Sequence, residues 1–338
     1  MSSSQLSSSG KRVAVLGATG AVGIEFLKVL ERRSFPIKEL RLLASPRSAG
    51  TSLFFQGEKI PVDVLRRESF RGIDLAFFSA GGEISKQFAP AALDAGALVI
   101  DNSSAFRMDP TVPLVIPEIN AHQINNHRGI IANPNCSTAI ALMALYPLHQ
   151  QFQLRRVIAS TYQAVSGAGA MGMEELETQI LDSTEKRPLI SKHFKHQIAF
   201  NLIPQIDSFL ENGYTREEMK LQNESRRILN LPDLQVSVTC VRVPVYRAHS
   251  LAIHASFQQP VSLSKAQDAL LSAPGVDLLD NPSESLYPMP LYAQESDCCH
   301  VGRLRLEQGN PYGLAFWVCG DQLLKGAALN AVQIAECL

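Results

Sequence analysis

One cysteine stands where the sequence favours a reactive thiol. Cys136 lies in the stretch ANPNCSTAIA, directly after an Asn-Pro-Asn turn and before an apolar run with helical spacing. The Asn-Pro pair disfavours helix before this point, and Ser137 with Thr138 can cap a helix that begins here. A thiol at a helix N-terminus has its pKa lowered by the helix dipole, and first-turn N–H groups can bind a developing oxyanion. The pattern is equally compatible with a buried packing cysteine.

A glycine loop near the N-terminus offers a partner for that chemistry. In KRVAVLGATGAVGIEFLKVL, a buried-type strand from Val13 to Leu16 precedes Gly17, Gly20 and Gly23, and a helical pattern follows. Strand, glycine turn and helix open a dinucleotide-binding βαβ unit, in which N–H groups at the helix start attract phosphate. The G-x-x-G-x-x-G spacing is one residue longer than the common one, and a plain structural turn is the alternative.

The end of the second strand bears on the choice of nucleotide. That strand ends in LLASPRSAG, which has no acid for the ribose hydroxyl of NAD but does have Arg47 and Ser48. A cation and a hydroxyl suit the 2′-phosphate of NADP, so we expect NADP. A solvated surface arginine is the alternative.

Further side chains suit a cysteine that works beside a nicotinamide. Such a cysteine forms a thioester or thiohemiacetal, and hydride moves to or from that carbon. His249 can move protons near neutral pH, and Arg242 can hold a carboxylate through two hydrogen bonds. Glu217 and Lys220 lie three apart on one face of a predicted helix that opens with the capping-box pair Thr215 and Glu218. Spacing alone favours rim or solvated positions for these residues, and the same alternative holds for Arg107, which follows a strand in DNSSAFR.

Composition limits the class of protein. The 338 residues suggest two domains, and the formal charge of −1 provides no basic field for nucleic acid or an anionic membrane. The six cysteines form no C-x-x-C pair and no zinc-like spacing with histidine, so we expect no metal and a reducing cytoplasm. The start, MSSSQLSSSG, is not a secretory signal and is predicted to be a disordered tail over residues 1–10.

The elements that must position these residues fall into two groups. Apolar strands at 13–16, 40–45, 73–80, 97–104 and 129–133 alternate with helical or loop segments, which predicts a parallel sheet covered on both faces. After Cys136 a helix reaches about residue 149, and further helices are predicted near 172–182 and 215–229. Segments 236–245 and 251–259 have the pattern of long antiparallel strands. A final strand and a helix over LLKGAALNAVQIAECL close the chain, and that helix is suited to pack back on the nucleotide domain.

Taken together, the motifs closely resemble one family, the aspartate-β-semialdehyde dehydrogenases of bacterial type. The matching segments occur in the family's order from about residue 12 to the end: GATGAVG, SPRSAG, DNSSAFR, NPNCST, STYQAVSGAG, AFNLIPQID, EEMK, CVRVPV followed by AHS, and LLKGAALNAVQIAE. The resemblance implies an α/β fold with a Rossmann-like NADP-binding domain at 11–135 and 322–338. It also implies an α+β catalytic and dimerisation domain at 136–321, and a homodimer.

The resemblance also implies a reaction and a role for each site residue. L-aspartyl-4-phosphate is reduced with NADPH to aspartate semialdehyde and phosphate, on the route to lysine, threonine and methionine. The family's nucleophile falls on Cys136, its acid/base on His249 and its acyl-orienting residue on Gln163. The substrate positions are Arg242 for the carboxylate, Glu217 for the amine, and Arg107 and Lys220 for phosphate, with Asn135 close by. The cofactor positions are Gly17, Thr19, Gly20, Ala21, Val22, Gly23, Arg47, Ser48, Ser166, Gly167 and Gln322, the last standing where many members have Asn.

Three rival functions share some of these features. N-acetyl-γ-glutamyl-phosphate reductase uses the same chemistry, but its acetylated substrate needs no acid such as Glu217. A phosphorylating glyceraldehyde-phosphate dehydrogenase would need sites for a second phosphate and usually an acid for NAD. A nucleotide-binding regulator without catalysis would have no use for the set Cys136, Gln163, Arg242 and His249.

Overall fold

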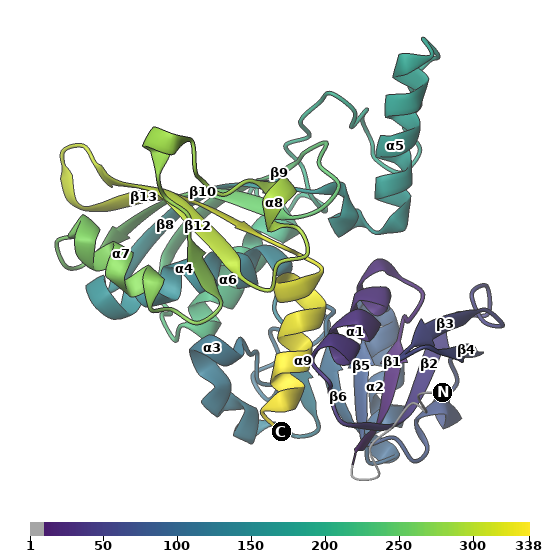
Figure 1. Ribbon diagram of the computed structural model, residues 1–338. Helices are drawn as coiled ribbons and strands as arrows, with labels where there is room; N and C mark the ends of the chain where they lie inside the picture. The colour runs from purple at the N-terminus through teal and green to yellow at the C-terminus, as the bar shows by residue number, and fades with distance from the viewer. Residues whose placement is uncertain (1–9) are drawn as a thin grey trace. The chain divides into compact units, whose positions relative to one another are not determined.

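The computed structural model describes residues 10–338, so the tail predicted for residues 1–10 lies, except for Gly10, outside the described residues. The chain forms two compact units. The first extends to Asn135 and takes in Ala327–Leu338, and the second is Cys136–Gly326. Figure 1 shows the mixed α/β character of both, as predicted. The chain passes from the first unit to the second between Asn135 and Cys136, the cysteine singled out by the sequence.

The first unit is built on a seven-stranded sheet. Its strands are β1 (Lys11–Leu16), β2 (Ile37–Ala44), β3 (Ser52–Phe55), β4 (Glu58–Val64), β5 (Leu75–Phe78), β6 (Leu98–Asp101) and β7 (Ile130–Ala132). The order is β3-β4-β2-β1-β5-β6-β7, and every pairing is parallel except that of β3 with β4. The predicted parallel sheet is therefore confirmed. The antiparallel β3–β4 hairpin at its edge was not predicted.

Helices cover this sheet. They are α1 (Ala21–Arg32), α2 (Gly82–Asp94), α3 (Pro117–Asn120) and α9 (Leu329–Glu336), with 3₁₀ turns at Arg67–Phe70 and Ala121–Asn126. The last helix, α9, packs against α1, α3 and β6, as predicted, and Glu336 near its end pairs with Arg33 at 2.6 Å. The single helix expected from LLKGAAL onward is in fact two pieces, because Leu324–Ala328 is a π-helical turn that precedes α9.

The second unit is built on a six-stranded mixed sheet. Its strands are β8 (Leu154–Gln163), β9 (Gln235–Arg242), β10 (His249–Phe257), β11 (Val276–Leu278), β12 (Cys299–Glu307) and β13 (Asn310–Gly320), in the order β11-β12-β13-β10-β8-β9. The two long strands predicted after residue 235 run in opposite directions, but they do not form a hairpin. Strand β8 lies between them, parallel to β9 and antiparallel to β10.

The helices of this unit leave one face of the sheet open. They are α4 (Cys136–Phe152), α5 (Ala170–Thr184), α6 (Arg216–Ile228), α7 (Leu263–Leu271) and α8 (Pro290–Ala293), with 3₁₀ turns at Val165–Ala168 and Pro282–Glu284. Helix α4 packs on β8, β10, β12 and β13, whereas α5 and the loop after it project away from the sheet (Figure 1). On the face opposite α4, Ile158 of β8 is 43% exposed.

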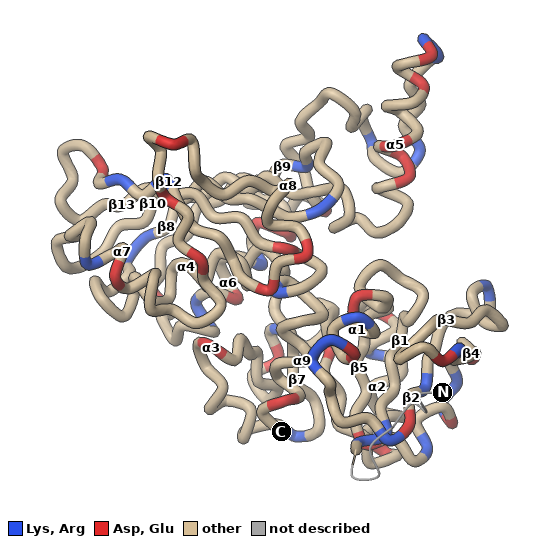
Figure 2. The backbone as a smooth tube through the Cα atoms, in the orientation of Figure 1, with Lys and Arg blue, Asp and Glu red and all other residues tan. Residues whose placement is uncertain are grey.

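Charge is mixed in both units. Figure 2 shows Lys and Arg interspersed with Asp and Glu, in keeping with the net charge of −1. Within residues 10–338, no helix is long and apolar enough to cross a membrane.

Candidate active site

A row of residues at one edge of the second sheet forms the centre of the site. Gln163 ends β8 and is in register with Arg242, which ends β9. His249 begins β10 and pairs on its other side with Gly320, which ends β13. Because Ser250 pairs with Tyr162, His249 and Gln163 are neighbours across the β8–β10 pairing. Three predicted site residues thus come from three adjacent strands.

The backbone of Ala164 orients two of these side chains. Its N–H donates to His249 Nδ1 at 3.1 Å, and its carbonyl accepts a hydrogen bond from Arg242 Nη1 at 2.7 Å. Since Nδ1 accepts this hydrogen bond, the neutral imidazole carries its proton on Nε2. The backbone of one residue therefore fixes both the tautomer of His249 and the direction of the Arg242 guanidinium.

Burial controls the charge of His249. The imidazole is 0% exposed, and its burial, together with the nearby positive charge of Arg242, lowers its pKa to about 3 against the opposing effect of Glu217. Arg242 is also buried, which lowers its pKa, and the charges of Glu217 and Cys136 oppose that shift. His249 is accordingly neutral at physiological pH. Its Nε2 is buried and has no hydrogen-bond partner within the described residues.

A buried carboxylate links the sheet to helix α6. Glu217 lies in the first turn of α6, accepts a hydrogen bond from Gln163 Nε2 at 3.2 Å, and pairs with Lys220 Nζ at 2.9 Å. Lys220 also contacts Asp207 at 3.1 Å. Burial alone would lower the pKa of Lys220, but the two carboxylates together raise it. The capping box predicted from Thr215 and Glu218 is present and fixes the start of this helix.

Cys136 is the first residue of α4 and is partly exposed. Ser137 and Thr138 therefore lie inside the first helical turn rather than at the cap position expected for them. A Cβ added to Gly326 would lie 2.7 Å from Cys136 Cβ, so the π-helical turn passes very close to the cysteine. Cys240, by contrast, is fully buried, and burial with the charge of Glu217 raises the pKa of its thiol. Of these two cysteines, only Cys136 is accessible to a substrate.

The predicted cofactor residues of this unit lie beside the same row. Gly167 is close enough that an added Cβ would approach Arg242 Nη1 to 2.9 Å and His249 Nε2 to 3.3 Å. The Gln322 side chain donates to Ser166 Oγ and accepts the Ala248 N–H at 2.8 Å. One N–H of the Gln322 amide is left for a ligand after these two bonds.

The glycine loop of the first unit fits a dinucleotide phosphate. Gly17 has φ +82°, and an added Cβ would lie 2.4 Å from the carbonyl oxygen of Ser79. A Cβ on Gly23 would lie 2.2 Å from the Gly17 carbonyl oxygen, so helix α1 can pack this closely on the loop only with glycine there. Helix α1 begins at Ala21 with no side-chain cap and no acid in its first turn. Its first N–H groups and dipole suit an anion, and Thr19 and Val22 lie half-buried around them.

The loop after β2 has the character expected for NADP. Arg47 is exposed and Ser48 half-buried in a turn closed by the Ser48 N–H to Ser45 carbonyl bond of 2.9 Å. A guanidinium and a hydroxyl at the end of the second strand fit a ribose 2′-phosphate. Both donors thus lie in the turn that follows β2.

Arg107 is held rigidly in the first unit. Its Nε donates to the Asn133 carbonyl at 2.9 Å and its Nη2 to the Asn102 carbonyl at 2.7 Å, and the side chain is 7% exposed. Asn135 is also buried. Two backbone carbonyls thus fix the direction of the Arg107 guanidinium, a group suited to oxyanion recognition.

Some residues of the site could not be found from the sequence. Ala164 acts through its backbone, so its side chain gave no signal. Asp207 and Asp321 are acids in a loop and after a strand, and only the structure shows that they pair with Lys220 and Arg247. The described residues contain no group of three or more His, Cys, Asp or Glu side chains that could hold a metal.

Comparison with known proteins decides the family. Residues 12–127 match the model of the semialdehyde dehydrogenase NAD-binding domain, and residues 145–325 match the semialdehyde dehydrogenase dimerisation domain. The aspartate-semialdehyde dehydrogenase of Synechocystis sp. is 50% identical over 97% of each chain. This chain belongs to the aspartate-semialdehyde dehydrogenase family. The rival N-acetyl-γ-glutamyl-phosphate reductase is not supported by these matches.

Solved structures of this aspartate-semialdehyde dehydrogenase family carry the same fold. The Vibrio cholerae aspartate semialdehyde dehydrogenase II, solved as a complex with ASA, is 44% identical and covers 98% of each chain, with a TM-score of 0.95. The Candida albicans enzyme, solved with NADP, is 25% identical with a TM-score of 0.76, and covers 96% of this chain and 98% of its own. The family model indicates a nicotinamide cofactor, and the glycine loop suits the phosphates of a dinucleotide.

Proposed function

We propose that this chain catalyses the NADPH-dependent reduction of L-aspartyl-4-phosphate to L-aspartate 4-semialdehyde and phosphate, a step toward lysine, threonine and methionine. The observation that carries the proposal is the row of Gln163, Arg242 and His249 on adjacent strands of a chain that belongs to this family. When bound, NADPH supplies the hydride that reduces an acyl group to an aldehyde. Everything else is done by the side chains and backbone of the protein.

Each charge of the substrate has a complementary residue. Arg242 binds the α-carboxylate, because its guanidinium is oriented by Ala164 and can form two parallel hydrogen bonds. Glu217 binds the α-ammonium group. Arg107 and Lys220 receive the phosphate. An ammonium group that reaches Glu217 competes with Lys220 for the same carboxylate, so substrate binding releases Lys220 toward phosphate.

The chemical steps follow from nucleophile and donor. The Cys136 thiolate attacks the acyl carbon and displaces phosphate, which forms a thioester, while Gln163 and backbone N–H groups hold the carbonyl oxygen. The thioester accepts hydride more readily than a carboxylate would. As the tetrahedral alkoxide collapses to aldehyde, the C–S bond breaks and Cys136 leaves as thiolate, stabilised by a hydrogen bond that the Nε2–H of neutral His249 donates to the sulfur.

Two variants test the nucleophile. We expect Cys136→Ala to abolish phosphate-dependent reduction of NADP with L-aspartate semialdehyde and to leave NADPH binding, measured by fluorescence, intact. Cys298→Ala is the matched control, because Cys298 is a partly exposed cysteine outside the proposed machinery. Near-normal turnover by Cys136→Ala would contradict the assignment. Wild-type protein without activity on this substrate would contradict the function itself.

The preference for NADP is part of the proposal and is tested at Arg47. Loss of a charged hydrogen bond to the 2′-phosphate costs roughly 1.5–3 kcal/mol, so Arg47→Ala should raise the KM for NADP by about tenfold or more. The KM for NAD, which lacks that phosphate, should stay within about twofold. Equal effects on both nucleotides would show that Arg47 does not read the phosphate.

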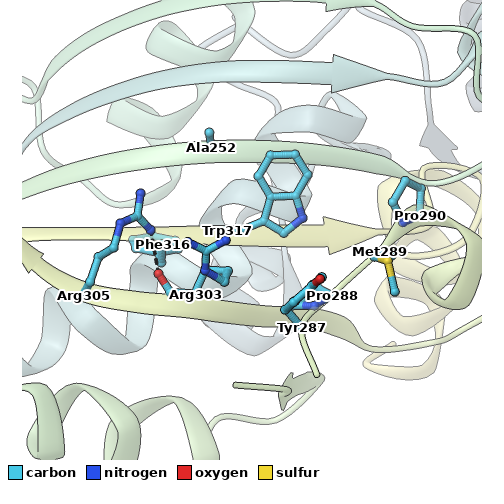
Figure 3. Close-up of a pocket in the computed structure, with 9 residues that line it drawn as sticks. All are labelled: Ala252, Tyr287, Pro288, Met289, Pro290, Arg303, Arg305, Phe316 and Trp317. Atoms are coloured by element: carbon cyan, nitrogen blue, oxygen red, sulfur yellow. Dashed lines mark hydrogen bonds between the residues drawn. The ribbon is translucent and has the colours of Figure 1, made fainter. Parts of the chain in front are cut away.

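We also propose a homodimer that forms through the second unit. The open sheet face carries a hollow of about 300 Å³ between Trp317, Phe316, Arg303 and the Tyr287–Pro290 segment (Figure 3). This unit also exposes apolar side chains: Leu291 and Tyr292, which follow Pro290 in α8, and Ile158 on β8 of the same sheet. Such a face is unusual on a monomer and is typical of an interface between copies.

The six free cysteines support a reducing, cytoplasmic location, which we include in this proposal.

Sedimentation velocity tests the dimer. Ile158→Asp places a charge on the open sheet face and should shift the protein from dimer to monomer. Phe54→Asp is the control, because Phe54 is 70% exposed on the β3 strand of the first unit. A monomeric wild-type protein, or an Ile158→Asp variant that stays dimeric, would contradict this interface.

A further inference from the structure

Two consecutive residues after β13 form hydrogen bonds with the segment that precedes His249. Asp321 and Gln322 are 0% and 2% exposed. Asp321 Oδ2 accepts a hydrogen bond from Arg247 Nε at 2.6 Å, and Gln322 Oε1 accepts the Ala248 N–H at 2.8 Å. The two residues immediately before His249 are therefore both held by side chains that follow the neighbouring strand β13.

The backbone of Ala248 is in a conformation that its neighbours must stabilise. Ala248 has φ +69°, in the left-handed region that residues other than glycine rarely adopt. A strained residue of this kind persists when its surroundings determine it, and such residues cluster at functional sites. At Ala248 the chain turns into β10, and the His249 ring meets the Ala164 N–H. The direction of the imidazole thus depends on a strained peptide held from outside.

Both carboxylate oxygens of Asp321 accept hydrogen bonds. Besides Arg247, its carboxylate accepts the Glu295 N–H at 2.6 Å and the Leu323 N–H at 2.9 Å. Arg247 is its cationic partner and is 14% exposed at the side chain. The outer contact of Arg247 with Glu295 spans 3.6 Å to a carboxylate that is 74% exposed, so the Asp321 bond is the dominant one. A buried carboxylate that lost Arg247 would be left without its counter-charge.

We propose that Arg247 and Asp321 are positioning residues for His249. Their buried ion pair holds Ala248 in its left-handed conformation, and this sets the His249 ring on the Ala164 N–H with Nε2 toward the reacting sulfur. The kinetic part of this inference rests on the proposed function. Neither residue touches the substrate in this scheme, and their effect on the rate passes through the histidine alone.

The decisive experiment compares Arg247→Met in two backgrounds. In the otherwise wild-type holoenzyme it should lower kcat by roughly 10- to 100-fold, the scale of a misplaced catalytic group, and leave the KM for L-aspartate semialdehyde within about twofold. In a His249→Asn background it should cause no further loss, because the group it positions is gone. Arg247→Lys retains the charge and should recover part of the rate.

Two controls separate positioning from loss of structure. Arg33→Met removes an ion pair of the same 2.6 Å length in the first unit and should leave kcat unchanged. The rate of alkylation of Cys136 by iodoacetamide should be the same in wild type and Arg247→Met, since the nucleophile is untouched. The proposal would be overturned if Arg247→Met lowered kcat by the same factor in the His249→Asn background as in the wild-type background, or if it left kcat unchanged in the wild-type background.

A spectroscopic measurement keeps the test independent of activity. The imidazole signals of His249, assigned by their absence in His249→Asn, should not titrate between about pH 5 and 8 in wild type. In Arg247→Met they should titrate or shift, because the ring has lost its fixed place. If the wild-type protein lacked dehydrogenase activity but its His249 signals still differed from those of Arg247→Met, the proposed function would be contradicted and the positioning role of Arg247 would stand. Identical titration in both proteins would contradict the positioning itself.

Discussion

A single methyl group at Gly167 should disturb two site residues at once. The Cβ of a Gly167→Ala variant would lie 2.9 Å from Arg242 Nη1 and 3.2 Å from His249 Cε1. Ordinary carbon contacts begin near 3.4 Å, so the guanidinium must retreat by about 0.5 Å and the imidazole by about 0.2 Å. Gly167 does not have a positive φ, so alanine fits its backbone and the whole effect falls on these two neighbours.

The expected magnitude follows from the bond that the displacement strains. Arg242 Nη1 donates to the Ala164 carbonyl at 2.7 Å, and a hydrogen bond from a charged group contributes about 1.5–3 kcal/mol. Partial to complete loss of this bond corresponds to a fall of roughly 10- to 100-fold in kcat/KM. Most of the change should appear in the KM for L-aspartate semialdehyde, because Arg242 binds the carboxylate and moves further than His249.

Steady-state kinetics with varied semialdehyde, at saturating NADP and phosphate, measure this change. Ala170→Ser is the control, since it adds one heavy atom at the exposed first residue of α5. Its rates and thermal unfolding midpoint should match wild type. Wild-type kcat/KM in Gly167→Ala would refute the reasoning, because it would show that Arg242 and His249 have room to yield. A loss confined to NADP affinity would show instead that Gly167 acts only on the cofactor.

Three further changes probe the packing and the titration of the site. Gly326→Ala places a Cβ 2.7 Å from Cys136 Cβ and should lower the free energy of unfolding by about 1–3 kcal/mol in urea titrations, together with kcat. Thr215→Ala removes the α6 cap and should lower the same free energy by about 0.5–2 kcal/mol, with Arg216→Ala as a neighbouring control that leaves the cap intact. Because burial lowers the pKa of His249 to about 3, the unfolded chain binds a proton there that the folded chain does not. The thermal midpoint should therefore fall as the pH drops from about 6.5 toward 4, less steeply in His249→Asn, and equal slopes would contradict the shift.

Local patterns were sufficient to predict the elements, because burial and capping act over a few residues. The apolar run from Val13 to Leu16 is a fully buried central strand, and the helix predicted near 215–229 begins at its capping box. The family resemblance extended these predictions to roles for Cys136 and Arg242. Each of these signals lies within a short segment of the chain.

Sheet order and backbone contacts could not be predicted from such local patterns. Whether β9 pairs with β10 or with β8 depends on contacts between strands more than 70 residues apart, and periodicity is the same in both cases. The π-helical turn at Leu324–Ala328 has an ordinary helical sequence, and the close approach of Gly326 to Cys136 is what distinguishes it. Ala164 orients His249 and Arg242 through its backbone N–H and carbonyl, and its residue type does not reveal this role. For these reasons only the structure shows that Gln163, Arg242 and His249 form one row on adjacent strands.

Three ionic groups of the site are paired with one another before any substrate arrives, and this bears on how the substrate ammonium group binds. Glu217 is paired with Lys220, and Lys220 is also paired with Asp207. The ammonium group of the substrate exchanges places with Lys220 at Glu217, whereas the substrate carboxylate supplies a counter-charge to the buried guanidinium of Arg242. Because isolated buried charges are costly, exchange keeps the empty site stable while it remains selective for a ligand with all three groups. A substrate analogue that lacks the ammonium group would leave Lys220 paired with Glu217. We therefore expect the enzyme to bind this analogue more weakly, and also to bind phosphate more weakly in its presence.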